Sequence, residues 1–100
     1  MKREDALSLL RSMTKSESLL RHARSVELVM EAYGRHFGED PNEWAICGLL
    51  HDADYEAYPD EHPNKIVKIL NDMGESKIAH AISAHYTKWN NPLHGPLRHL

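Results

Sequence analysis

Apolar residues recur along this chain at spacings of three and four positions, the pattern typical of amphipathic helices. The segment from Lys2 to Met13 is predicted to form a first short helix. A second helix is predicted to follow the capping-box sequence Thr14-Lys15-Ser16-Glu17 and to run to about Phe37, where Gly38 ends it. Its apolar stripe consists of Leu19, Ala23, Val26, Met30, Tyr33 and Phe37.

A third helix is predicted to begin after Asp40, which suits the N-cap, with Pro41 in the first turn. From Trp44 to about His51 this helix is apolar nearly all round, so we expect it to lie buried at the centre of the fold. A polar and aromatic loop, Asp52–Asp60, follows.

Two further helices complete the pattern. Asp60 is expected to cap the fourth helix, and Gly74 to end it. The fifth helix is expected to start at Glu75 or Ser76 and to end before Asn90-Asn91-Pro92. Their stripes are His62, Ile66, Ile69 and Met73 in the fourth helix, and Ile78, Ile82, His85 and Trp89 in the fifth.

These elements predict an all-α fold, a bundle of about five helices. Strand-type alternation is absent, and the chain has only five proline and five glycine residues. Its 100 residues suggest a single domain spanning 1–100, with enough surface to bury for one core but not for two.

Charge and cysteine content exclude several classes of function. The net charge of −3 provides no basic patch, so nucleic acid is not an expected partner. The single cysteine, Cys47, excludes a disulfide framework and favours a reducing compartment. No apolar run approaches the length of a membrane span, and the N-terminus lacks a signal-like apolar segment, so we expect a soluble cytoplasmic protein.

The chemistry of the chain is concentrated after the third helix. Its apolar run ends in His51-Asp52, and two more carboxylates, Asp54 and Glu56, follow within four residues. An imidazole nitrogen beside a carboxylate oxygen is the ligand combination that divalent first-row metals accept. The pair alone is weak support for a metal site, and its weight depends on the other histidines.

Eight histidines in 100 residues are unusual, and four of them lie next to apolar helix positions. His22, His51, His62 and His85 come from four different helices, and their spacing predicts that each points toward the core. A buried histidine needs partners for both ring nitrogens, which one or two metal ions would provide. The alternative is that each is a hydrogen-bonded structural histidine. The remaining four are expected to be solvated: His36, His80, His94 and His99.

Four short segments occur in order along the chain: His22 in Leu20-Arg21-His22-Ala23, His51-Asp52 after an apolar helix, His62-Pro63 opening the next helix, and His85 in Ile82-Ser83-Ala84-His85. Their order and spacing resemble the HD superfamily of metal-dependent phosphohydrolases. The His-Asp-x-Asp-Tyr-Glu context is similar to that of the small bacterial predicted HD hydrolases. The resemblance covers about residues 5 to 90.

The resemblance implies a helical fold around a central metal site. His22, His51 and Asp52 match the ligands of a first ion, and His62 and His85 match the positions that hold a second ion in two-metal members. Asp52 could bridge two ions, because a carboxylate has two oxygens. Manganese, iron, cobalt, nickel, zinc and magnesium all remain open as the divalent metal cofactor.

The implied reaction is hydrolysis of a phosphomonoester or nucleotide by a metal-activated water. Asp52, Asp54 and Glu56 are the candidate catalytic carboxylates, with Asp54 or Glu56 as general base or as an orienting residue. A solvated acidic loop is the alternative for the last two. Four cations near the ligands in sequence are candidate phosphate contacts or ordinary surface charges: Arg21, Arg24, Lys65 and Lys88.

The chain departs from the family pattern in three places. Family members carry a further ligand aspartate on a later helix, whereas this sequence has no acidic residue after Glu75. Ile66 stands where the His-Pro-x-x-Gly motif has glycine, and Tyr55 where some members have lysine. Three explanations stay open as expectations: a fragment of a longer protein, a natural short form that has lost the site, or a subunit that borrows a ligand from a second subunit. Exposed apolar surface near Trp89 and Leu97 would favour a homo-oligomer.

Two other classes of function stay open beside the hydrolase. One is a non-catalytic metal- or nucleotide-binding domain, which the missing aspartate favours. The other is a helical interaction module whose histidines are structural.

Overall fold

The chain folds into five α-helices, and the all-α prediction is confirmed. The computed structural model describes the backbone of residues 1–89 and the side chains of residues 1–84. No strand occurs within residues 1–89. The helices are α1 (Arg3–Met13), α2 (Glu17–His36), α3 (Pro41–Leu50), α4 (Asn64–Asp72) and α5 (Ser76–Trp89).

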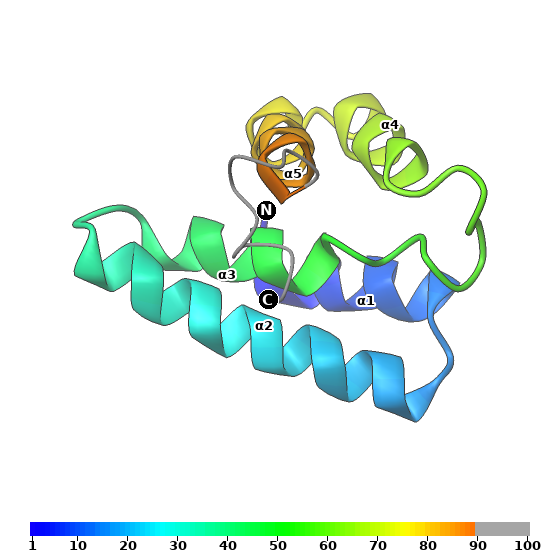
Figure 1. Cartoon of the computed structure of the whole chain (residues 1–100), viewed down its shortest axis with the longest axis horizontal. Helices are drawn as coiled ribbons and strands as arrows, with labels where there is room; N and C mark the ends of the chain where they lie inside the picture. Colours follow the sequence, from blue (N-terminus) through cyan, green and yellow to red (C-terminus); the bar gives the residue numbers. More distant parts are fainter. Residues whose placement is uncertain (90–100) are drawn as a thin grey trace.

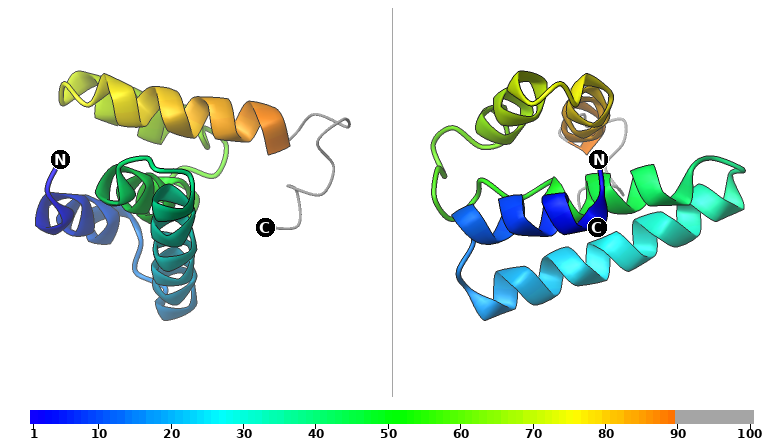
Figure 2. Two further views of the ribbon diagram at one scale, coloured as in Figure 1. Left: turned by 90° about the vertical axis from the view of Figure 1, so that its left-hand side faces the viewer. Right: turned by 180° about the vertical axis from the view of Figure 1, so that it is seen from behind.

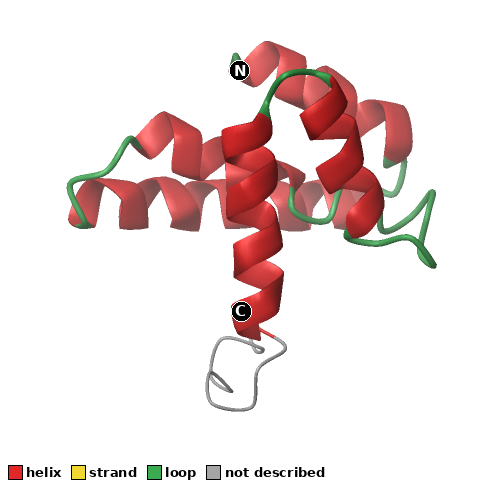
Figure 3. Cartoon of the chain, turned by 90° about the horizontal axis from the view of Figure 1, so that it is seen from above, coloured by secondary structure: helices red, strands yellow, loops and turns green. Residues whose placement is uncertain are grey.

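Helix α3 lies at the centre and contacts α1, α2 and α5 (Figure 1). The long helix α2 runs along one side of α3, and the α4–α5 hairpin covers the opposite side (Figure 2). Seen from above, α5 crosses over α2 and α3 (Figure 3). None of the helices in the described part of the chain combines the length and apolar character needed to cross a membrane.

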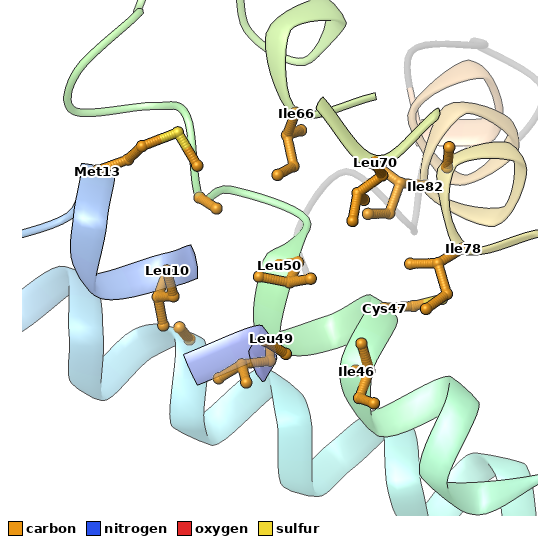
Figure 4. Packing of buried hydrophobic residues seen from close by; sticks show 14 residues of the cluster. Leu10, Met13, Ile46, Cys47, Leu49, Leu50, Ile66, Leu70, Ile78 and Ile82 are labelled. Carbon is orange, nitrogen blue, oxygen red and sulfur yellow. The ribbon is translucent and has the colours of Figure 1, made fainter. Parts of the chain in front are cut away.

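The central position of α3 follows from its composition. Its last six residues, Ala45 to Leu50, are all buried, as predicted for a helix that is apolar all round. Leu50 and Leu49 pack among side chains from the other helices, as Figure 4 shows. The labelled core residues outside α3 are Leu10, Met13, Ile66, Leu70, Ile78 and Ile82.

Glycine permits the close packing of α2 against α3. A Cβ atom at Gly48 would lie 2.8 Å from the Val26 carbonyl oxygen and 2.8 Å from Cγ of Met30. At the other end of the same interface, a Cβ atom at Gly34 would lie 3.0 Å from Cα of Pro41. A side chain at Gly48 would therefore force its neighbours to shift, and one at Gly34 would be tightly packed against Pro41.

The predicted capping box at the start of α2 is wrong. The N-cap is Ser16, whose hydroxyl accepts a hydrogen bond from the Leu19 amide. Thr14 is buried instead, and its hydroxyl donates to the Ala53 carbonyl at 3.0 Å. The Thr14 hydroxyl, which the local sequence predicts to cap α2, thus binds instead to Ala53, 39 residues away in the sequence.

The predicted start of α4 at Asp60 is also wrong. The helix begins at Asn64, Asp60 is exposed, and the peptide bond between His62 and Pro63 is cis. His62 therefore precedes the helix, consistent with the tendency of proline to exclude its preceding residue from helical conformation. The amide of Ile66, in the first turn, donates to Asp54 at 2.9 Å, so Asp54 caps α4 from the preceding loop.

The buried face of α2 differs from the predicted stripe near its C-terminal end. Ala23 is buried as expected, but Tyr33 and Phe37 are exposed, the latter by 60%. Gly34 rather than Tyr33 faces α3. Glu27 is buried in the same helix, because Arg3 of α1 and Arg24 bind its carboxylate.

Candidate metal centre

Three ligand-type side chains converge where α3 ends. His22 comes from α2, His51 ends α3, and Asp52 follows it; one ligand atom from each lies within 4.8 Å of the others. Nε2 of His51 lies 3.0 Å from Oδ2 of Asp52, and Nε2 of His22 lies 3.7 Å from the same oxygen. The structure therefore brings together the residues expected to hold a first ion.

The hydrogen bonding of His51 defines its tautomer. The side chain is buried, and Nδ1 lies 2.7 Å from the carbonyl oxygen of Gly48. A carbonyl oxygen only accepts, so Nδ1 carries the proton. In the neutral ring Nε2 then presents a lone pair toward Asp52, which is the orientation that a metal ligand requires.

His62 reaches the same carboxylate from the loop before α4. Its Nε2 lies 3.4 Å from Oδ1 of Asp52, so the two oxygens of Asp52 face different histidines. On the other side of the ring, Nδ1 lies 2.5 Å from Oδ1 of Asp54. The rings of Tyr55 and His62 pack in a T-shaped arrangement at a centroid distance of 5.7 Å.

Asp54 lies behind His62. Its side chain is completely buried, and its two oxygens bind the His62 ring and the Ile66 amide. With both oxygens bound in this way, Asp54 is suited to orient the His62 ring, and its role as general base or as orienting residue stays a prediction. The sequence contains no local signal for its second task of capping α4.

Glu56 holds the connection between α1 and α2. Its carboxylate accepts hydrogen bonds from the amides of Lys15 at 2.5 Å and Ser16 at 3.4 Å. These contacts link the loop after α3 to the start of α2. This contact gives the carboxylate a structural task, and the catalytic role expected of Glu56 stays a prediction.

The candidate phosphate-binding residues differ in their contacts and in their exposure to solvent. Arg24 binds Glu27 at 2.8 Å, and Nζ of Lys65 lies 4.7 Å from the centroid of the Tyr58 ring. Arg21 is exposed and precedes His22 in α2. The side chains of the other two predicted site residues, Lys88 and His85, lie outside the described residues.

The geometry of the cluster suits a cation. Asp52 lies between the Nε2 atoms of His51 and His62, and a lone pair facing a carboxylate is repulsive unless a proton or a metal ion lies between them. Mixed nitrogen and oxygen donors of this kind fit divalent first-row metals. His22 was expected to face the core, but its side chain is 45% exposed, so the group is open to solvent on the α2 side.

A cavity of about 220 Å³ adjoins this group and was not anticipated from the sequence. His51 forms part of its wall, and α2, α3 and α5 supply the rest. The helical periodicity of these residues predicts that they face the core. It does not indicate whether the space between them is filled by side chains or left as a cavity. The apolar lining includes Val26, Met30, Trp44, Cys47, Ala81 and Ile82.

Comparison with known protein families identifies the HD domain. The family model for the HD domain matches residues 19–98. This range begins within the first turn of α2, extends through α5 and includes every residue of the His22–His51–Asp52 group. No match was found among the curated proteins or among the solved structures. Because the match extends over most of the chain and contains the ligand-type residues in the order described above, the chain belongs to the HD domain family.

Proposed function

We propose that this protein is a metal-dependent phosphohydrolase that acts on a phosphomonoester or a nucleotide. The observation that carries the proposal is the convergence of His22, His51 and His62 on the carboxylate of Asp52. Membership of the HD domain family supports the same reaction class.

His22, His51 and Asp52 would hold the first ion, with His62 and His85 available for a second. A divalent ion held by these residues would lower the pKa of a bound water and neutralise phosphate oxygens. The protein contributes orientation: Gly48 holds His51 through Nδ1, and Asp54 holds His62 in the same way. The exposed edge of His22 leaves a route for substrate from solvent.

A non-catalytic metal- or nucleotide-binding domain is the second candidate. Binding needs an ion but no turnover, and the three ligand-type residues that bring their atoms together in the described part of the chain could hold an ion in either case. Three protein ligands leave a further position, which a nucleotide phosphate could occupy without being hydrolysed.

The first experiment measures the metal-to-protein ratio of the purified protein by elemental mass spectrometry. We expect a ratio near one or two in the wild type and near zero in Asp52→Ala. Asp60→Ala, which removes an exposed carboxylate from the same loop, is the matched control and should leave the ratio unchanged. A ratio near zero in the wild type after metal is added back contradicts the hydrolase and the metal-binding form of the second candidate, and favours structural histidines.

The second experiment separates the two candidates. Turnover of a chromogenic phosphomonoester is measured for the wild type, His51→Ala and Asp52→Ala, with circular dichroism to verify folding. Loss of turnover in both folded variants supports the hydrolase. Stoichiometric metal without turnover by the wild type supports the binding domain.

A further inference from the structure

The cavity beside His51 has the chemistry of a binding site for an organic group. Its apolar walls come from α2, α3 and α5, and two polar residues contribute to its lining, His51 and Glu43. Small-molecule sites in proteins are typically apolar pockets with a few polar groups that orient the ligand. This cavity therefore suits one apolar group of a larger molecule.

His51 joins the cavity to the candidate metal centre. Its Nε2 atom lies 3.0 Å from Asp52, while the same side chain lines the cavity. The cavity and the His22–His51–Asp52 group therefore adjoin at the His51 side chain, so a single molecule can contact both. The two sites share a wall.

The size and lining favour a planar ring. An apolar cavity of about 150 Å³ is known to hold benzene. The present volume, about 220 Å³, is sufficient for one aromatic ring with a small substituent. Trp44 offers an indole, and Met30 a thioether, and both make favourable contacts with aromatic groups.

Glu43 contributes a negatively charged carboxylate to the lining of the cavity. Its carboxylate lies 3.3 Å from Nζ of Lys77, and it belongs to the first turn of α3. A carboxylate only accepts hydrogen bonds, so a donor group on the ring is favoured and a second negative charge is disfavoured.

We propose that this cavity receives the aromatic ring of a phosphomonoester substrate whose phosphate lies at the His22–His51–Asp52 group. The inference rests on the proposed function for the phosphate end. The placement of the ring rests independently on the volume and the lining of the cavity.

The test uses phenylphosphonate, which presents the ring and the anion but cannot be hydrolysed at its carbon–phosphorus bond. The full chain is labelled with 5-fluorotryptophan, and its two tryptophan resonances are assigned with Trp89→Phe. We expect the fluorine resonance of Trp44 to shift saturably with phenylphosphonate. Methylphosphonate, which lacks the ring, should leave the resonance unchanged.

A cavity-filling variant provides the second measurement. Ala84 lines the cavity from α5, and Ala84→Leu should weaken phenylphosphonate binding by about tenfold or more, a loss typical of a blocked apolar pocket. The metal-to-protein ratio should stay unchanged. His80→Leu places the same side chain on an exposed position of α5 and should leave binding unaltered.

The outcomes separate the two proposals. Hydrolysis of a chromogenic phosphomonoester with an unchanged Trp44 resonance, and with equal binding by Ala84→Leu, overturns the ring site and leaves the hydrolase proposal intact. A saturable shift of the Trp44 resonance in a protein that neither retains metal nor hydrolyses phosphomonoesters supports the ring site and overturns the proposed function.

Discussion

The buried carboxylate of Asp54 lies 2.5 Å from Nδ1 of His62, and its other oxygen accepts the amide of Ile66 at 2.9 Å. One side chain thus caps α4 and orients a ring that faces Asp52. The start of a helix and the geometry of the candidate metal centre depend on the same group.

The substitution Asp54→Asn should therefore lower both the stability of the protein and its affinity for metal. The amide oxygen of asparagine can accept from the His62 ring or from the Ile66 amide, but its nitrogen can only donate. Loss of a residue that orients a ligand typically lowers metal affinity by about 10–100-fold, and we expect that range here. Metal titration and urea denaturation measure the two effects. Asp60→Asn is the control, and equal affinities for the two variants would contradict the assigned role.

Gly48 should determine how closely His22 approaches His51. It packs against the Val26 carbonyl, one turn after His22, and it precedes His51 by three residues. Overpacking typically costs about 1–3 kcal/mol, more than the gain of up to about 1 kcal/mol in helix propensity. We expect Gly48→Ala to lower the free energy of unfolding and the metal affinity together.

The control for Gly48→Ala is Gly34→Ala. Gly34 lies in the same α2–α3 interface, and a Cβ atom there would lie 3.0 Å from Pro41 and 3.1 Å from Trp44. This variant should lower stability without lowering metal affinity, because its strain acts at the other end of the interface. If the two variants lose metal equally, the contact at Gly48 does not control the ligand geometry.

Glu27 should make the stability of the protein depend on acid. Burial alone raises the pKa of Glu27, but hydrogen bonds and charges from Arg3 and Arg24 outweigh it and hold the pKa below its ordinary value of 4.5. The unfolded chain therefore binds this proton more readily than the folded one. The stabilisation is complete above pH 4.5 and is lost as the pH falls through the lowered pKa.

Glu27→Gln tests this dependence. At pH 7 the variant should lose roughly 1.5–3 kcal/mol, the range for hydrogen bonds to charged groups. Its free energy of unfolding should also change less than that of the wild type below pH 4.5. Glu31→Gln removes a more exposed pair with Arg35 and should cost under about 1 kcal/mol. Urea denaturation across pH gives both quantities, and parallel pH profiles for Glu27→Gln and the wild type would refute the linkage.

Cys47 should react slowly in the folded protein. Burial, and then the nearby charge of Glu43, raises the pKa of the Cys47 thiol to about 12. Relative to its ordinary value of 9.0, this lowers the thiolate fraction at pH 8 by roughly a thousandfold. Alkylation by iodoacetamide should thus be far slower in buffer than in denaturing urea. Equal rates in the two conditions would show that the thiol is accessible and ionises normally.

The helices were largely predictable because their signals are local. Apolar spacing, Pro41 after Asp40 and the glycines at 38 and 74 each act within a few residues. The burial of α3 could also be predicted, since a helix without charge between Trp44 and Leu50 has no face suited to water. The same local reasoning placed His51 and Asp52 together at its end.

The errors arose where a distant partner overrides a local preference. Thr14 has the right chemistry for an N-cap, yet Ala53 takes its hydroxyl. Asp60 has the right position in the sequence to cap α4. Asp54 caps the helix instead, by accepting a hydrogen bond from the Ile66 amide 12 residues away. Glu27 is a charged residue that sequence alone assigns to solvent, and only Arg3 on another helix makes its burial tolerable.

By itself the sequence determined the fold class, the helices on which the ligand-type residues lie, and the combination of imidazole and carboxylate at the end of α3. Tertiary structure alone decided that the two oxygens of Asp52 face different histidines, that His22 stays open to solvent, and that a cavity lies beside His51. The physical reason is that helix formation depends on neighbours within a few residues. The distance between side chains on α2 and α3 instead depends on how closely two helix backbones pack, as at Gly48.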